Sequence, residues 1–120
     1  MPRAARGMPG EHLPLKPLDF SVLLVLSEGQ QYGYGLVKRI ARREAGGIRL
    51  APSNLYYVLD RMIDAGLVEE TRPGGEEGGM RRRWFRITSF GRTVLKAEAR
   101  RLATVVRTAE RMRLTPGGEA

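Results

Sequence analysis

Three consecutive arginines, Arg81, Arg82 and Arg83, are the residues of this chain best suited to bind a polyanion. A guanidinium group is permanently charged and presents several N–H donors that match the oxygens of a phosphate. The arginines open the second strand of an expected hairpin, and a helix expected at residues 52–66 precedes that hairpin. This order indicates a helix in a DNA groove beside arginines that neutralise the neighbouring phosphates. Two glutamates in the hairpin loop would repel phosphates, so we expect contact at the base of the hairpin rather than at its tip.

Catalytic chemistry has little support in the sequence. The single histidine, His12, lies in a segment rich in proline and glycine, so a His-based triad or metal site cannot be built within one chain. Asp60 and Asp64 are one helical turn apart, and we interpret them as solvated surface charges rather than as a metal pair. The chain has no cysteine, which excludes structural disulfides and thiolate metal sites. We therefore expect no enzymatic activity, no metal and no cofactor.

Length and charge narrow the choice of partner. A chain of 120 residues has room for one domain, and 21 Lys and Arg against 13 Asp and Glu give a net charge of +8. This excess favours nucleic acid or an acidic membrane surface, although a generic basic protein would also show it. The longest apolar stretch, around Val22–Leu26, is too short to span a bilayer, and the N-terminus lacks the apolar core of a signal peptide. We expect a cytoplasmic protein that does not associate with membranes.

The elements that must position these residues follow from periodicity. Apolar spacing predicts four helices and two strands, with helices at about 17–28, 34–45, 52–66 and 88–113 and strands at about 67–72 and 82–87. A short strand would also fit the β-branched content of the first segment. Pro52 suits the first turn of the third helix, Gly66 its end, and Thr88 the N-cap of the last helix. The expected fold is mainly α (α+β), in the order α–α–α–β–β that a winged helix-turn-helix domain with a two-stranded wing requires.

The first and last helices are more apolar than so small a domain can cover by itself. The last helix has near-heptad apolar spacing, which Glu98 interrupts. Pairing with a second copy of the chain would bury both helices, so we predict a homodimer. The residues expected at its interface are Leu18, Leu23, Leu95, Leu102, Val105, Val106, Ala109 and Met112.

The domain organisation follows from these elements. We expect a flexible basic arm at 1–14, a winged-helix DNA-binding domain at 15–88, a C-terminal dimerisation helix at 89–113 and a disordered tail at 114–120. On the third helix, the positions away from the apolar stripe are Ser53, Asn54, Tyr57 and Arg61, with Tyr56 at the boundary. Their hydroxyl and amide groups suit base edges and phosphates. For Tyr56 the alternative is that the ring packs under the hairpin.

Several of these segments resemble the PadR-type transcriptional regulators. Tyr32–Leu36 stands where the family reads His-Gly-Tyr-Glu, and Ser53–Leu59 is similar to its Gly-Thr-Leu-Tyr-Pro-x-Leu stretch. Arg82–Gly91 is similar to the family's Arg-Lys-Tyr-Tyr-Arg-Leu-Thr-x-x-Gly. The resemblance covers about residues 17–113, and it departs from the family at Gly35, usually acidic, and at Tyr57, usually proline.

The resemblance implies a homodimeric winged-helix repressor of the shorter subfamily, which has a single C-terminal helix. Its expected partner is double-stranded DNA with a pseudo-palindromic operator, which Tyr34 and Lys38 would approach near the backbone. Family members often respond to a ligand. Trp84 is the candidate for a pocket that binds a small-molecule effector, and ordinary packing is the alternative.

Two other functions fit parts of the sequence. A winged-helix module that binds proteins rather than DNA would show no salt-dependent DNA affinity. A small RNA-binding protein would need exposed aromatic residues on a sheet face, where the wing offers only Trp84.

Overall fold

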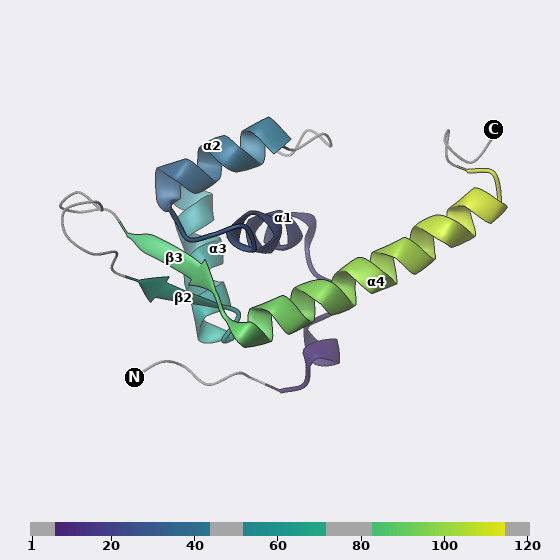
Figure 1. The fold of residues 1–120 in the computed structure, drawn as a ribbon, viewed down its shortest axis with the longest axis horizontal. Helices are drawn as coiled ribbons and strands as arrows, with labels where there is room; N and C mark the ends of the chain where they lie inside the picture. The colour runs from purple at the N-terminus through teal and green to yellow at the C-terminus, as the bar shows by residue number, and fades with distance from the viewer. Residues whose placement is uncertain (1–6, 44–51, 72–82, 115–120) are drawn as a thin grey trace.

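The computed structural model describes residues 7–43, 52–71 and 83–114, with the side chains of Arg43, Pro52 and Ser53 excepted. Arg81 and Arg82 therefore lie outside the described residues, as does the side chain of Ser53. The fold is mostly helical with a small antiparallel sheet, as predicted (Figure 1). Its elements are a 3-10 helix η1 (Pro9–His12), the helices α1 (Pro17–Leu26), α2 (Gly33–Arg43), α3 (Pro52–Asp64) and α4 (Ser89–Arg111), and the strands β1 (Gln31–Tyr32), β2 (Val68–Thr71) and β3 (Trp84–Ile87).

Helix α1 lies at the centre of the protomer, against α2, α4 and β3. Val22, Leu23, Val25 and Leu26 are at most 1% exposed. The sequence suggested that a second copy would be needed to bury this helix, but the neighbouring helices already surround it. Leu23 therefore belongs to the core of its own protomer and not to a dimer face, whereas Leu18 is half-buried.

The sheet has three strands in the order β1-β3-β2, one more than predicted. Residues 31 and 32 were expected in a turn, but they pair with Phe85 and Trp84 of β3. A strand of two residues is too short for alternation to show in the sequence. The predicted core face of β3 is confirmed, because Phe85 and Ile87 are both buried.

The end of α3, the sheet and the start of α4 meet in one polar junction. Gly66, with φ of +81°, ends the third helical segment as predicted. Thr88 is the predicted N-cap of α4, since its Oγ1 accepts from the Gly91 N–H at 2.8 Å. The same hydroxyl donates to the Gly66 carbonyl at 2.6 Å. These bonds fix the direction in which α4 leaves the domain.

The described part of the expected N-terminal arm packs against α4. The ring of His12 meets the ring of Phe90 edge-on, with centroids 5.3 Å apart, and the Leu15 N–H donates to Glu98 at 3.0 Å. Residues 7–14 thus include an ordered 3-10 turn, in contrast to the flexible arm we expected, because Glu98 supplies an anchor that the sequence did not reveal. Glu98 is 1% exposed and accepts two hydrogen bonds from Arg101, at 2.6 and 2.9 Å.

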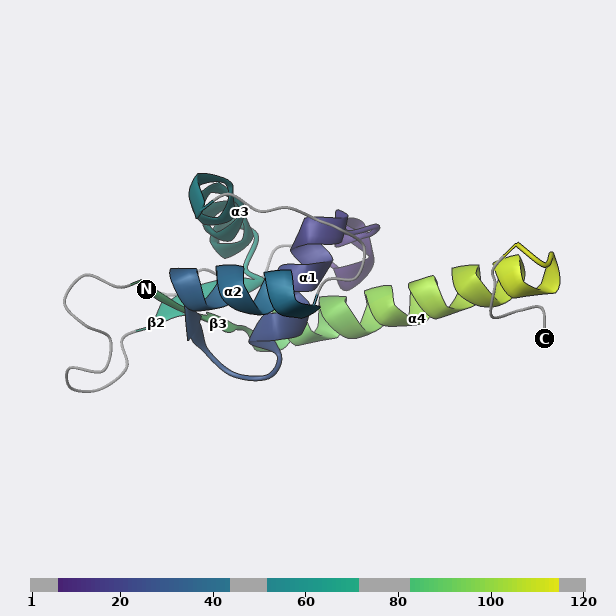
Figure 2. The same cartoon turned by 90° about the horizontal axis from the view of Figure 1, so that it is seen from above.

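Helix α4 packs on the domain through its first half and then extends away from it (Figures 1 and 2). Leu95, expected at the dimer interface, is 8% exposed within the protomer, so it belongs to the core. Farther along, Val105, Val106 and Met112 are 50%, 47% and 62% exposed. No helix within the described ranges is both long and apolar enough to cross a bilayer.

Candidate nucleic-acid interface

Helix α3 presents one exposed face, set by the apolar stripe that holds it to the core. Leu55, Val58, Leu59 and Met62 are buried, as the spacing predicted. The opposite side exposes Asn54 and Tyr57 in the first half of the helix, and the side chain of Tyr57 is 69% exposed. An amide and a phenol beside the N-terminus of a helix are groups that read base edges and phosphates.

The second half of the same face is acidic. Asp60 and Asp64 are both exposed there. Carboxylates repel phosphates, so the first half of α3 is the part that a duplex can approach. This agrees with helix-turn-helix docking, in which the N-terminal residues of the recognition helix contact the bases.

Helix α2 adds a basic edge beside this face. Tyr34 is 60% exposed, and the Lys38 ammonium lies 5.4 Å from the centroid of its ring. Arg42 follows Lys38 by one turn and is also exposed. It was missing from our candidate residues, although its spacing of four from Lys38 could have revealed it. Arg39, by contrast, is bound to Glu28 at 2.7 Å.

Tyr56 joins α3 to its neighbours rather than facing a groove. Its half-buried ring lies 6.2 Å from that of Phe85, so the packing alternative describes it better than the groove prediction. Its hydroxyl lies against Gly33, where an added Cβ would clash with the phenol. Gly33 therefore allows the start of α2 to approach α3 closely.

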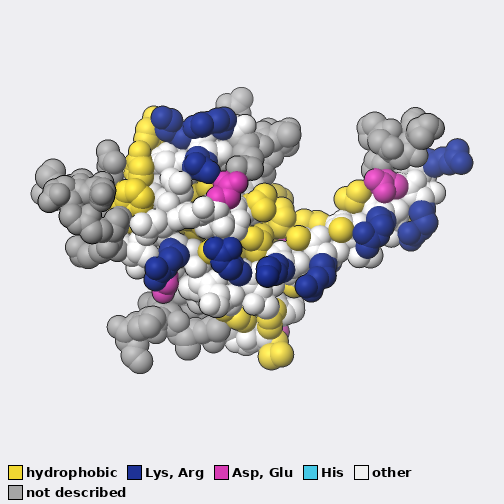
Figure 3. All heavy atoms as spheres, viewed as in Figure 1, with side chains coloured by type: hydrophobic (Ala, Val, Ile, Leu, Met, Phe, Trp, Pro, Cys, Tyr) yellow, Lys and Arg dark blue, Asp and Glu magenta, His cyan; other side chains and the backbone are white. Residues whose placement is uncertain are grey.

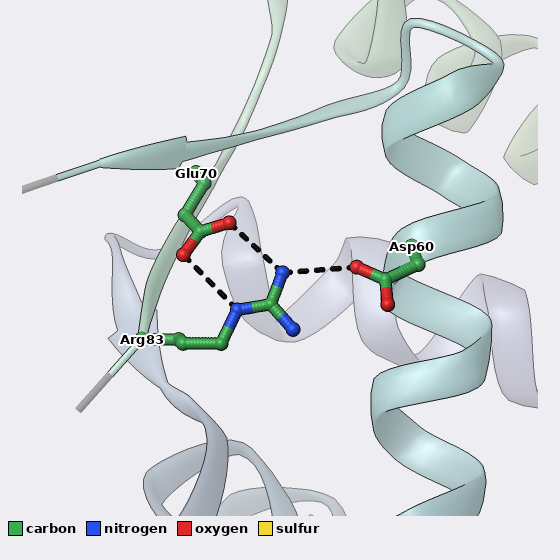
Figure 4. A network of polar contacts seen from close by, with 3 residues as sticks. All are labelled: Asp60, Glu70 and Arg83. Atoms are coloured by element: carbon green, nitrogen blue, oxygen red, sulfur yellow. Dashed lines mark hydrogen bonds and ion pairs between the residues drawn. The ribbon is translucent and has the colours of Figure 1, made fainter. Parts of the chain in front are cut away.

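Arg83 is held by carboxylates on two elements (Figure 4). Its Nε and Nη2 donate to the two oxygens of Glu70 at 3.0 and 2.8 Å, and Nη2 also donates to Asp60 Oδ1 at 2.9 Å. The guanidinium carbon lies 5.1 Å from the centroid of the Phe85 ring. The hydrogen bonds that Arg83 donates to Glu70 and Asp60 raise the pKa of its guanidinium despite its partial burial. Arg83 was predicted to bind phosphate, but here it connects β2 to α3.

Arg61 has a comparable role on the other side of the helix. It donates through Nη2 to Asp19 Oδ1 at 2.8 Å, and Asp19 is only 5% exposed. The hydrogen bond that Arg61 donates to Asp19 raises the pKa of Arg61. The pair connects α3 to α1, so Arg61 is engaged within the protomer rather than presented to DNA as predicted.

Trp84 packs against a neighbouring aromatic ring. It is half-buried, and its ring lies 5.1 Å from that of Tyr32 on the outer face of the sheet. A shallow hollow of about 470 Å³ lies elsewhere, lined by Gly66, Glu69, Arg86, Ile87, Thr88, Ser89 and Phe90. Within the three described ranges, His, Asp and Glu form no group of three or more that could hold a metal ion.

The chain matches one family model and several solved structures. The model of the Transcriptional regulator PadR-like family matches residues 22–97, more than half of the chain. The chain is similar to a PadR family transcription regulator from Clostridium difficile, with 20% identity, a TM-score of 0.71, and coverage of 81% of this chain and 98% of that one. A padr family transcriptional regulator from Eggerthella lenta is 29% identical, with a TM-score of 0.62 and coverage of 78% and 81%. Bacillus subtilis PadR in complex with operator DNA is 18% identical, with a TM-score of 0.59 and coverage of 68% and 46%.

Proposed function

Because the chain belongs to the PadR-like family of transcriptional regulators, we propose that it is a sequence-specific DNA-binding repressor that acts as a homodimer on a pseudo-palindromic operator. The exposed, uncharged first half of α3, bordered by the basic edge of α2, is the observation that carries this proposal. A similar fold is known in complex with operator DNA, in the Bacillus subtilis protein. We place this activity in the cytoplasm, together with the DNA.

In this proposal, two residues of α3 recognise the base sequence of the DNA. The carboxamide of Asn54 can pair with the N6 and N7 atoms of an adenine, and Tyr57 can contact a thymine methyl or a phosphate oxygen. Lys38 and Arg42 would neutralise phosphates beside the groove. The N-terminal end of α3 carries a partial positive charge, which favours a phosphate there.

The proposed dimer uses the apolar residues that the protomer leaves accessible. Val105, Val106 and Met112 project from a helix that extends beyond the domain. Burying such side chains against a second copy of α4 would remove apolar surface from water, at about 25 cal/mol per Å². Leu24, 38% exposed on α1, adds to this surface although the sequence did not single it out. The remaining accessible residues predicted for the interface are Leu18, Leu102 and Ala109.

A response to a small-molecule effector stays a prediction. Trp84 packs against Tyr32 and does not line the hollow at the start of α4. A titration of candidate ligands, followed by Trp84 fluorescence, tests this prediction. A saturable change in fluorescence would indicate that the protein binds an effector.

Fluorescence anisotropy with the duplex upstream of the chain's own gene tests the proposal. We expect this duplex to bind more tightly than a shuffled duplex of equal composition. Asn54→Ala should reduce that preference by roughly 5- to 150-fold, the range expected when one bidentate base pairing is removed. Thr104→Ala, on an exposed part of α4, is the control and should bind like the wild type.

Two results would contradict the proposal. Equal affinity for both duplexes would remove sequence specificity. Absence of salt-dependent binding to any duplex would favour the protein-interaction module instead.

A further inference from the structure

Helix α4 carries a second basic surface that the proposed function does not use. Arg92, Lys96, Arg100, Arg107 and Arg111 are separated by four or seven residues, which places them on one face of the helix. All five are exposed. We call these five residues the basic stripe. Figure 3 shows a row of Lys and Arg side chains along α4 on the face turned to the viewer.

Carboxylates do not neutralise the stripe within the described part of the chain. Its side chains form no ion pair there, and those that donate hydrogen bonds do so to neutral oxygens: Arg92 to the Ser27 carbonyl at 3.4 Å, Arg107 to Thr104 at 3.3 Å and Arg111 to Thr108 at 3.4 Å. Of the two glutamates on α4, Glu98 is bound to Arg101 and Glu110 borders the distal end of the stripe. Like charges one turn apart repel each other, so a polyanion along this face would relieve that repulsion.

The stripe is separate from the other two candidate surfaces. By helical spacing it lies opposite Val105 and Ala109, and Val106 lies beside its Arg92 edge. A dimer centred on Val105 and Ala109 would therefore leave the stripe exposed. In Figure 1 α3 lies behind β3, and in Figure 2 α3 lies at the upper edge of the molecule while α4 runs below it and extends to the right. DNA that is bound by α3 therefore does not cover the stripe of the same protomer.

We propose that the basic stripe is a second, sequence-independent binding surface for the phosphates of duplex DNA, and that it holds a segment other than the one read by α3. This inference rests on the proposed function for the identity of the first segment. From Arg92 to Arg111 the stripe is roughly 28 Å long, and neighbouring cations are about 6 Å apart along the helix axis, except that Arg100 and Arg107 are about 10.5 Å apart. That length matches about eight base pairs of duplex at about 3.4 Å per pair.

The composition of the stripe favours DNA over an anionic membrane. An interfacial helix inserts apolar side chains on the same side as its snorkelling cations. Here the positions between the cations include Thr93, Ala103 and Thr104, and the large apolar residues lie on the opposite face. Four of the five cations are arginines, which bind phosphate oxygens through several donors at once.

A recruitment assay with the full chain tests the proposal. The protein is first bound to an immobilised duplex from upstream of its gene, and a labelled duplex of unrelated sequence is then added. Lys96→Gln/Arg100→Gln removes two stripe charges that form no side-chain hydrogen bond in the structure. Lys16→Gln/Arg113→Gln removes two exposed charges elsewhere and is the matched control.

The wild type and the control should both retain the labelled duplex. The stripe variant should bind the immobilised duplex within about twofold of wild type but retain at least about tenfold less labelled duplex. Its log–log salt slope for the second duplex should decrease by about 0.9 for each phosphate that the variant no longer neutralises. In a second form of the assay, the immobilised duplex carries long flanking sequences. If these flanks displace the labelled duplex, the stripe binds flanking DNA of the same DNA molecule.

Several outcomes would overturn the proposal. Equal retention by the stripe variant, or equal loss in the control, would show that the stripe has no specific role. Competition by phosphatidylserine vesicles or by single-stranded RNA at concentrations below that of duplex would assign the stripe to a different partner. Asn54→Ala/Tyr57→Ala separates the two proposals, because it should weaken only the first duplex if α3 reads that DNA.

Discussion

Arginines that look alike in the sequence of this protein have different partners in the structure. Arg61 and Arg83 looked like free cations on a DNA-facing surface, yet each is bound to a carboxylate on another element. The partner of Arg61 is 42 residues away, and the two partners of Arg83 are 13 and 23 residues away. Helical spacing shows which residues share a face of one helix, but it does not show which carboxylate the fold brings to them.

The different roles of Arg83 and Arg42 predict different salt dependences. Arg42→Gln should reduce the slope of log affinity for DNA against log salt by about 1, as expected when one phosphate is no longer neutralised. Arg83→Gln should leave this slope unchanged, because Arg83 is bound by Glu70 and Asp60. Anisotropy titrations at several salt concentrations measure both values. A reduced slope for Arg83→Gln would mean that Arg83 exchanges its carboxylates for a phosphate in the complex.

Glu98 predicts a dependence of stability on pH. Hydrogen bonds from Arg101, and then from the Leu15 N–H, lower the pKa of Glu98 below its ordinary value of 4.5 in spite of its burial. Because the folded-state pKa is lowered, the stabilisation is present above the unfolded pKa and is lost as the pH falls through the folded pKa. Between about pH 5 and about pH 3, the free energy of unfolding of Glu98→Gln should therefore decrease less than that of wild type.

Urea denaturation across this pH range measures the effect. Glu110→Gln, which changes an exposed carboxylate on the same helix, is the control and should follow the wild type. Parallel pH profiles for wild type and Glu98→Gln would contradict the assigned role of Glu98.

Helices α2, α3 and α4 were largely predictable because each has a strong apolar period, whereas α1 is apolar on nearly all sides and its sequence also fitted a short strand. The stripe of α3, its end at Gly66 and the capping role of Thr88 all follow from residue types and spacing, and the structure confirms them. Strand β1 was not predictable, since its two residues join the sheet only through pairing with β3, which lies more than fifty residues later. The 3-10 turn of η1 depends likewise on contact with α4.

The junction of α3 and α4 predicts an unusually sensitive glycine. A Cβ at Gly91 would meet the Leu67 carbonyl oxygen and the Ile87 side chain, and the backbone carbonyl cannot move aside. Gly91→Ala should therefore destabilise the fold by about 1–3 kcal/mol, even though alanine is the better helix former. Urea denaturation followed by circular dichroism gives the value. Gly10→Ala is the matched control, since no atom lies within 4 Å of its added Cβ.

At the scale of the whole molecule, the apolar helices show what sequence can and cannot predict. Both α1 and the distal half of α4 looked too apolar for a single protomer. For α1 this was wrong, because α2, α4 and β3 cover it. The distal half of α4 does remain exposed, and its pairing with a second copy stays a proposal. The amount of core that surrounds a helix is a property of the fold and is not visible in the helix's own period.

If the proposed dimer forms through the apolar face of α4, a single negative charge on that face should prevent dimerisation. Val106→Asp would place a carboxylate within the apolar face of α4, where pairing would desolvate it. We expect a monomer by light scattering and a loss of affinity for the upstream duplex, with the helical content of the protomer retained. Thr104→Asp adds the same charge away from that face and should remain dimeric. A Val106→Asp variant of unchanged mass would contradict the proposed interface.

The exposed course of α4 also affects how mutations of this protein should be interpreted. From Ala103 to Thr108 every residue is exposed, so those side chains contribute little to folding of the protomer that carries them. A substitution in this segment that keeps helix propensity but changes the thermal midpoint should therefore act mainly through another molecule. The size of such a change should depend on protein concentration, which makes this part of the helix an internal indicator of association.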